Sequence, residues 1–406
     1  MATAKEVEAL EAASIPVGGT VAAPAAAPRA AQPRRPWAIG LSALLPGLGS
    51  VALGRVTPGA WILAGWAIAI VTLAISRGDV ARTLVQGRLE DWVAFATLAV
   101  TVVGLWVWGI LDVAITATRP IRRVGVSQWR LAGRRFRKNH LAMAGLAIMV
   151  FLYWVTLLAP FLTPYDPNFQ GNIVLDRYLR PSAEHLLGTD KFGRDVLSRI
   201  LYGARISLTI GFLSVAISVT LGTLLGAVAG YFRGWVDTAI ARFIDMMLSI
   251  PRLILVLVVI ALFRPEIWIV IVVLGFTGWE GTARIVRGQF LQLREQEFVQ
   301  ASRALGYGDA RIILRHILPN TLAPIIVIAT LGIGTTILLE AALSFLGLGV
   351  QPPTASWGSM VNDGRDAMIT AWWISTFPGL AIVLTVVSFN LLGDGLRDAL
   401  DPRLRG

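Results

Sequence analysis

The chain has 406 residues, of which 55% are hydrophobic and only 15% are charged, and its mean hydropathy is +0.67. A water-soluble protein of this length needs more charge to cover its surface, so the composition predicts an integral membrane protein. The net charge of +11 would fit nucleic-acid binding, but the arginines stand in short loops between apolar blocks, which is the pattern of cytoplasmic loops. We therefore expect no nucleic-acid partner.

Several kinds of catalytic and cofactor site are excluded by the residues that are missing. The chain has no cysteine, and its three histidines lie far apart, so the sequence shows no recognisable metal-ligand cluster. No lysine follows a glycine, as the phosphate-binding loop of an ATPase requires. We expect no bound cofactor, no catalytic residues and no ATP site in this chain.

The first third of the chain contains a tail and a separate group of apolar segments. Residues 1–35 are rich in Ala and Pro and predict a disordered cytoplasmic tail. The chain opens without the layout of a signal peptide, so we expect no cleavage there. Residues 36–118 predict an N-terminal membrane module of two to three apolar segments, whose role the sequence does not identify. Gly and Pro interrupt 36–54, which suits a re-entrant or interfacial segment, whereas spans are expected at about 60–75 and 92–116.

A basic segment separates this module from the rest of the chain. Residues 119–140 are dense in arginine and predict the cytoplasmic face of the membrane. Contact with anionic lipid head groups fits this charge, although membrane topology alone explains it.

Six further apolar segments follow and define the sidedness of the chain. If each of the six segments crosses the membrane once, starting from the cytoplasmic basic segment, residues 163–200 and 350–370 lie outside and 284–320 lie inside. Both termini then lie in the cytoplasm. The charges agree, because 284–320 holds six arginines and 350–370 only Arg365. The predicted spans are about 141–161, 204–230, 238–262, 267–283, 321–348 and 371–393.

Two sequence features predict details of these spans. Pro251 lies inside an expected span and predicts a kink. Gly222, Gly226 and Gly230 recur at four-residue spacing, which predicts a close approach to a neighbouring helix.

The cytoplasmic segment 284–320 has the pattern of a helical hairpin. Residues 297–305 predict a helix with Phe298, Ala301 and Leu305 on one side, ended by Gly306 in a left-handed conformation. A second helix is expected at 310–317, and Pro319 would stop or redirect the chain before the next span. A hairpin of this shape can dock in a cleft of another protein; an ordinary structured loop is the alternative.

The same segment resembles the cytoplasmic coupling signature of binding-protein-dependent ABC importer permeases. That signature opens with Glu-Ala-Ala, continues with a Gly and closes with Leu-Pro. Here Gln300 replaces the Glu and Ser302 replaces the second Ala. The matching residues are Ala301, Gly306, Leu318 and Pro319.

Longer stretches resemble the dipeptide/oligopeptide/nickel subfamily, and within it the second of the two paired permeases. They follow in order between about residues 130 and 405, whereas residues 37–117 are outside the family pattern. The stretches are 187–199 with 202–205, 340–349, 352–358 and 390–398.

The resemblance implies an all-α polytopic membrane protein with a six-helix type I ABC importer permease core at 141–406. It also implies a heteromeric importer in a prokaryotic cytoplasmic membrane, with a second permease, two ATP-binding subunits that bind ATP and Mg, and an extracytoplasmic substrate-binding protein. The coupling helix would sit in a groove of an ATPase subunit and drive alternating access. Peptides are the expected cargo, with nickel chelates, glutathione-like molecules or sugars also open.

Polar residues at two other places are further candidates for function. Asp190, Gly193, Arg194 and Asp195 would form an external gate or meet the binding protein. The alternative is that Thr189 or Asp190 simply caps an amphipathic helix at the outer interface. Glu340 and Asp245 lie in or near spans, where ionisable groups are costly. They would serve structural pairing or, alternatively, a proton or substrate pathway.

Two other classes of function are alternatives. An ion-gradient-driven secondary transporter using Glu340 or Asp245 is the alternative to the ABC permease. A membrane-embedded enzyme is the other class, but the sequence shows no clustered nucleophile, base or metal ligands that it would need.

Overall fold

A computed structural model describes residues 37–53, 55–75, 89–118, 128–163, 165–263 and 266–401. These residues form helices joined by turns and loops, with one isolated β-bridge between Thr189 and Asp195. The predicted disordered tail at 1–35 lies outside the described residues, and so do residues 119–127 of the basic segment.

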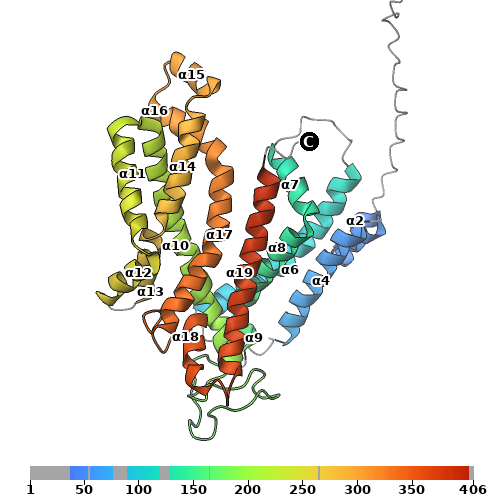
Figure 1. Ribbon diagram of the computed structural model, residues 1–406. Coiled ribbons are helices and arrows are strands. Elements are labelled where there is room, and N and C mark those ends of the chain that lie inside the picture. Colours follow the sequence, from blue (N-terminus) through green and yellow to red (C-terminus); the bar gives the residue numbers. More distant parts are fainter. Residues whose placement is uncertain are drawn as a thin grey trace, which may run out of the picture.

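The helices divide into an N-terminal group and a larger group that follows it (Figure 1). The N-terminal group consists of α2 (Trp37–Leu44), α3 (Leu48–Ala52), α4 (Val56–Ile75) and α6 (Leu89–Thr118). The larger group begins with α7 (Gln128–Lys138), α8 (His140–Leu157), α9 (Ala159–Leu162), α10 (Val196–Phe232), α11 (Gly234–Ser249), α12 (Arg252–Ala261), α13 (Ile267–Phe276) and α14 (Trp279–Leu293). It continues with α15 (Glu297–Ala304), α16 (Asp309–Arg311), the π-helical turn η1 (Ile312–Ile317), α17 (Leu318–Phe345), α18 (Trp357–Asp363), the 3-10 turn η2 (Arg365–Ala367) and α19 (Trp373–Leu400).

The predicted all-α polytopic architecture is confirmed. Within the described ranges, six helices are long and apolar enough to cross a membrane, and the bent pair α11–α12 adds a seventh crossing if it is counted as one span. The apolar run Pro58–Ala74 of α4 is shorter but coincides with the remaining predicted span. The segment at 36–54 does not cross, because α2 and α3 have 8 and 5 residues, or about 12 and 7.5 Å of helix.

Three predicted boundaries need correction. The chain bends by 83° between α11 and α12, so the kink predicted at Pro251 is confirmed, but it divides the predicted span 238–262 into two helices. Helix α14 extends to Leu293, ten residues beyond the predicted end at 283, because Arg284 and Arg287 are paired with aspartates of α11. Pro319 does not stop the chain: it lies in the first turn of α17, which continues directly from η1. The wider π turn accommodates a residue that lacks an N–H.

Helix α10 is the centre of the larger group, since it packs against α13, α14 and α17. The predicted close approach at its three glycines is confirmed, and the neighbour is α14. A Cβ at Gly222 would lie 2.6 Å from the Trp279 carbonyl oxygen, and one at Gly226 would lie 2.5 Å from that of Ala283. A Cβ at Gly230 would lie 2.6 Å from Cβ of Phe290. Only glycine permits this separation of the two backbones.

The N-terminal group is joined to the larger group along α6. Leu98 of α6 packs with Leu158 and Phe161, which lie at α8 and α9. Trp154 of α8 donates a hydrogen bond from Nε1 to Oγ1 of Thr101 in α6, at 3.2 Å. The group therefore lies against one edge of the larger group, on the side away from α11 and α14 (Figure 1).

Figure 1 also shows the two ends of the molecule. Helices α7 and α15 and the C-terminal end of α19 lie at one end, whereas α18 and the loop at 165–195 lie at the other. The predicted inside and outside segments thus lie at opposite ends of the helices.

Candidate functional site

The predicted coupling segment forms a hairpin at residues 296–317, made of α15, a turn, α16 and η1. Its turn is a Schellman motif: Tyr307 N–H donates to the Ser302 carbonyl at 3.2 Å, and Gly306 N–H donates to the Arg303 carbonyl at 2.9 Å. Gly306 has φ +77°, so its predicted left-handed conformation is confirmed. This hairpin projects beyond the other helices in Figure 1.

The two sides of α15 have different environments. Val299 and Ser302 are buried, and Val299 packs with Ile312 and Ile317 of η1. On the predicted apolar side, Phe298 is 42% exposed and Leu305 is 72% exposed, and Ala301 is also exposed. The apolar side of α15 therefore has no partner among the described residues, although burial of such a surface is favourable.

The other motif residues lie around this helix. Gln300 is exposed and donates from Nε2 to the Glu295 carbonyl at 3.1 Å. Leu318 is partly buried and Pro319 is exposed, at the point where η1 becomes α17. The structure thus gathers all six motif residues within the hairpin and the first turn of α17.

A residue that the sequence analysis missed holds the hairpin in place. Tyr231, in the last turn of α10, donates from its hydroxyl to Oδ1 of Asp309 at 2.5 Å. The Arg303 guanidinium lies 5.3 Å from the centre of the Tyr231 ring, and Arg294 donates to the Tyr231 backbone carbonyl. These contacts connect α10 to both arms of the hairpin. In the sequence, Tyr231 is only an aromatic residue near the end of a predicted span. Such residues are too common to indicate an anchoring role.

Stacked rings stiffen the base of the hairpin. The rings of Tyr307 and His316 are parallel within 8°, with centres 6.0 Å apart. The Arg311 guanidinium lies 4.3 Å from the centre of the Tyr307 ring. Because η1 continues into α17, the hairpin is a rigid extension of a membrane helix.

At the opposite end of the molecule, the predicted external residues form a buried network. Asp190 accepts from the Arg194 side chain (Nε) at 2.7 Å and from the Phe192 backbone at 2.8 Å. Arg194 and Lys191 also pair with Asp363 of α18, at 3.6 and 2.8 Å. The network therefore ties the external loop to α18.

The predicted helix cap at Thr189 or Asp190 is wrong. Helix α10 begins at Val196, and Asp195 is its N-cap: its Oδ2 accepts from the Ser198 backbone N–H at 2.8 Å. Thr189 instead binds the preceding loop, donating from its hydroxyl to the Asp176 carbonyl at 2.6 Å. Gly193 has φ +74° and supplies the tight turn that brings Arg194 back to Asp190.

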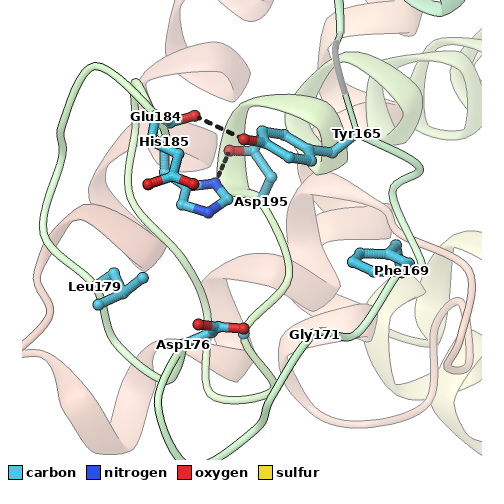
Figure 2. Close-up of a pocket in the computed structure, with 9 residues that line it drawn as sticks. Tyr165, Phe169, Gly171, Asp176, Leu179, Glu184, His185 and Asp195 are labelled. Atoms are coloured by element: carbon cyan, nitrogen blue, oxygen red, sulfur yellow. Dashed lines mark hydrogen bonds and ion pairs between the residues drawn. The ribbon is translucent and has the colours of Figure 1, made fainter.

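A polar pocket of about 190 Å³ lies beside this cap (Figure 2). Nδ1 of His185 lies 2.9 Å from Oδ1 of Asp195, and the His185 ring stands 4.8 Å from that of Tyr165. The Tyr165 hydroxyl donates to the Glu184 carbonyl at 3.3 Å. Burial, followed by the charges of Glu184 and Asp195, raises the pKa of Tyr165, so its hydroxyl remains a neutral donor.

The two predicted intramembrane carboxylates have opposite environments. Glu340 is fully buried, and it accepts hydrogen bonds from Ser344 at 2.7 Å and Ser207 at 3.4 Å. Asp245 is paired with Arg284 at 2.8 Å, but its side chain is 58% exposed. The structure does not bring these two carboxylates together.

Comparison with known proteins identifies the family. The chain is 45% identical over 280 residues to the dipeptide transport system permease protein DppC of Alkalihalophilus pseudofirmus, covering 69% of this chain and 91% of that protein. This chain belongs to the binding-protein-dependent ABC permeases. Residues 222–406 match the family described as the binding-protein-dependent transport system inner membrane component. Residues 127–181 match the N-terminal TM domain of oligopeptide transport permease C. The predicted family is confirmed.

This permease is also similar to a second dipeptide permease and a glutathione permease. It is 46% identical over 286 residues to the dipeptide transport system permease protein DppC of Bacillus subtilis, covering 70% of this chain and 89% of that protein. It is 45% identical over 279 residues to the glutathione transport system permease protein GsiD of Escherichia coli, covering 68% and 91%. A solved structure of the MetNI methionine ABC transporter aligns with 50% of this chain and 96% of its own, with a TM-score of 0.43 and 19% identity. The N-terminal helices α2–α6 lie outside both family matches.

Proposed function

We propose that this permease is the membrane subunit of an ATP-driven importer for di- or oligopeptides in a prokaryotic cytoplasmic membrane. The names of its relatives support peptides as cargo, with glutathione as a related peptide. The observation that carries the proposal is the apolar side of α15, which no part of the chain that the structure describes covers, on a hairpin that carries the coupling signature.

The partners follow from this assignment. A second permease completes the pathway, and two ATP-binding subunits supply the ATP and Mg sites for which this chain has no phosphate-binding loop. An extracytoplasmic binding protein delivers the cargo to the external end, where the Asp190–Arg194–Asp363 network makes a rigid platform. The hairpin and both termini face the cytoplasm.

In the proposed mechanism, the hairpin moves as a rigid body and transmits the motion of the ATP-binding subunits to the membrane helices. Phe298, Ala301 and Leu305 insert into a groove of an ATP-binding subunit, and closure of the two ATPases moves α15. Because Tyr231 ties the hairpin to α10, and η1 continues into α17, this displacement is passed to two membrane helices. ATP binding and substrate access thereby bias the same two-state element, which is alternating access.

An ion-gradient-driven mechanism receives no support from the residues on which it depended. Glu340 is enclosed by serines, and Asp245 is neutralised by Arg284. We therefore assign the driving force to ATP.

The test places a charge on the docking side of α15. Ala301→Arg in the assembled complex should abolish uptake into proteoliposomes and the stimulation of ATPase activity by the loaded binding protein. The control is Gly133→Arg, which adds the same charge at the same end of the molecule, on α7, where a side chain meets nothing within 4 Å. The coupling assignment is refuted if Ala301→Arg retains both activities.

A further inference from the structure

A row of opposite charges runs along the seam between α11 and α14, which pack side by side (Figure 1). Arg287 donates from Nε and Nη2 to the two carboxylate oxygens of Asp237, at 2.5 and 2.9 Å. Further along, Arg284 binds Asp245 at 2.8 Å. Glu280 lies one helical turn beyond Arg284 on the same face of α14.

One pair of this row, Asp245 and Arg284, lies in two candidate membrane segments yet is open on the surface of the chain. The side chains of Asp245 and Arg284 are 58% and 57% exposed, and both belong to segments that pass the length and hydropathy requirements for a span. Charged groups facing lipid tails are too costly to be retained, so such groups face a bundle interior or a water-filled cavity. The seam is therefore not a lipid-facing surface.

The end of the seam near Glu280, away from the hairpin, lies beside breaks in two helical segments. The chain breaks at Ile250–Pro251 between α11 and α12, and again at Thr277–Gly278 between α13 and α14. Arg252 spans the second break: its Nη2 donates to the Leu274 carbonyl at 2.9 Å, in the last turn of α13. The guanidinium occupies the space that a side chain at position 278 would need. About 20 Å of helix separates Glu280 from the end of α14 at Leu293.

Unsatisfied polar atoms meet at this point. Glu280 is only 8% exposed, and its Oε2 has no hydrogen-bond partner among the described residues; the same holds for Nε of Arg252. The two groups attract each other electrostatically, but each keeps one free polar atom. Buried polar atoms are almost always paired, so these two require a partner that is not part of this chain's described structure.

An apolar cleft of about 540 Å³ opens beside the same breaks. This volume lies in the range of small-molecule sites. Its walls come from α11, from α12 and from α13 with the residue after it, and they include Met247, Leu255, Val259, Phe276 and Thr277.

We propose that Arg252 and Glu280 form a substrate-contact site on the translocation pathway that takes zwitterionic peptides. The Glu280 carboxylate accepts hydrogen bonds from the peptide ammonium group, Arg252 faces its carboxylate, and the apolar cleft receives a side chain. Broken helices that leave polar groups free at membrane depth are a known means of building transport sites. This inference rests on the proposed function, since it requires a peptide as cargo.

The experiment measures selectivity for the ammonium group. The complete complex in proteoliposomes is supplied with Ala-Phe or N-acetyl-Ala-Phe, and uptake is divided by the fraction of binding protein that each peptide loads. The wild type should then favour Ala-Phe by about tenfold, the effect of one charge-assisted hydrogen bond. Glu280→Gln should remove this preference, whereas Glu280→Asp and the exposed control Glu266→Gln should keep it. Retention of the preference in Glu280→Gln overturns the proposal, and so does its absence from the wild type.

A second measurement tests the water access that the proposal requires, and it remains possible if Glu280→Gln fails to assemble. Because the chain has no cysteine, Arg284→Cys introduces its only thiol. A water-soluble cationic methanethiosulfonate should modify that thiol in the assembled complex but not one introduced by Val383→Cys, an exposed apolar position on α19. An unreactive thiol at 284, with and without ATP, places the seam away from water and overturns the proposal. Wild-type complexes that import neither peptide refute the proposed function, while this labelling still tests the seam.

Discussion

The docking role of α15 leads to a quantitative prediction for Leu305→Ala. Leu305 is 72% exposed in the chain, so most of its side chain remains available for burial against a partner. Full burial of a leucine side chain contributes about 1.5–3 kcal/mol, and the exposed share therefore contributes about 1–2 kcal/mol. Leu305→Ala should weaken binding of the ATP-binding subunits roughly 5- to 30-fold.

Titration of the isolated permease pair with purified ATP-binding subunits measures this effect. Leu305 is the C-cap of α15 with φ −76° and ψ 0°, a conformation that alanine adopts equally well, so the thermal stability of the chain should not change. The comparison variant is Val299→Ala on the same helix, whose side chain is fully buried in the hairpin. It should lower hairpin stability through lost packing. The reasoning is refuted if Leu305→Ala binds as tightly as the wild type, or if it loses stability as Val299→Ala does.

Two further predictions concern the helices that receive the displacement. Gly226→Val should lower the unfolding temperature in detergent, because a Cβ there lies 2.5 Å from the Ala283 carbonyl oxygen and overpacking costs about 1–3 kcal/mol; an unchanged unfolding temperature would show that α10 and α14 are not in close contact. Tyr231→Phe removes the hydroxyl that binds the Asp309 carboxylate, a loss of about 1.5–3 kcal/mol. Hydrogen–deuterium exchange should then increase at residues 297–317 but not in α19, and equal exchange in both proteins would contradict the anchoring role of Tyr231.

The parts of the structure that depend on local sequence were predictable. Gly306 ends α15 because glycine adopts positive φ without strain. The helix-forming residues before it predict which part of the chain is helical. The spacing of Gly222, Gly226 and Gly230 indicated a packed helix face. Proline and glycine act over a few residues, so their effects follow from the sequence alone.

The parts that depend on distant partners were not predictable. The charges of Arg284 and Arg287 indicated a loop, but aspartates about 40 and 50 residues earlier neutralise them and allow α14 to continue. The break at Gly278 depends on Arg252, which lies on another helix.

The position of the N-terminal helices has a consequence for what their loss would change. Helices α2–α6 touch the larger group through α6, along α8 and α9, whereas the charged seam lies on the far side of α10 and α17. An addition at this edge leaves both the seam and the hairpin free. Loss of these helices would therefore remove no contact of the seam or of the hairpin.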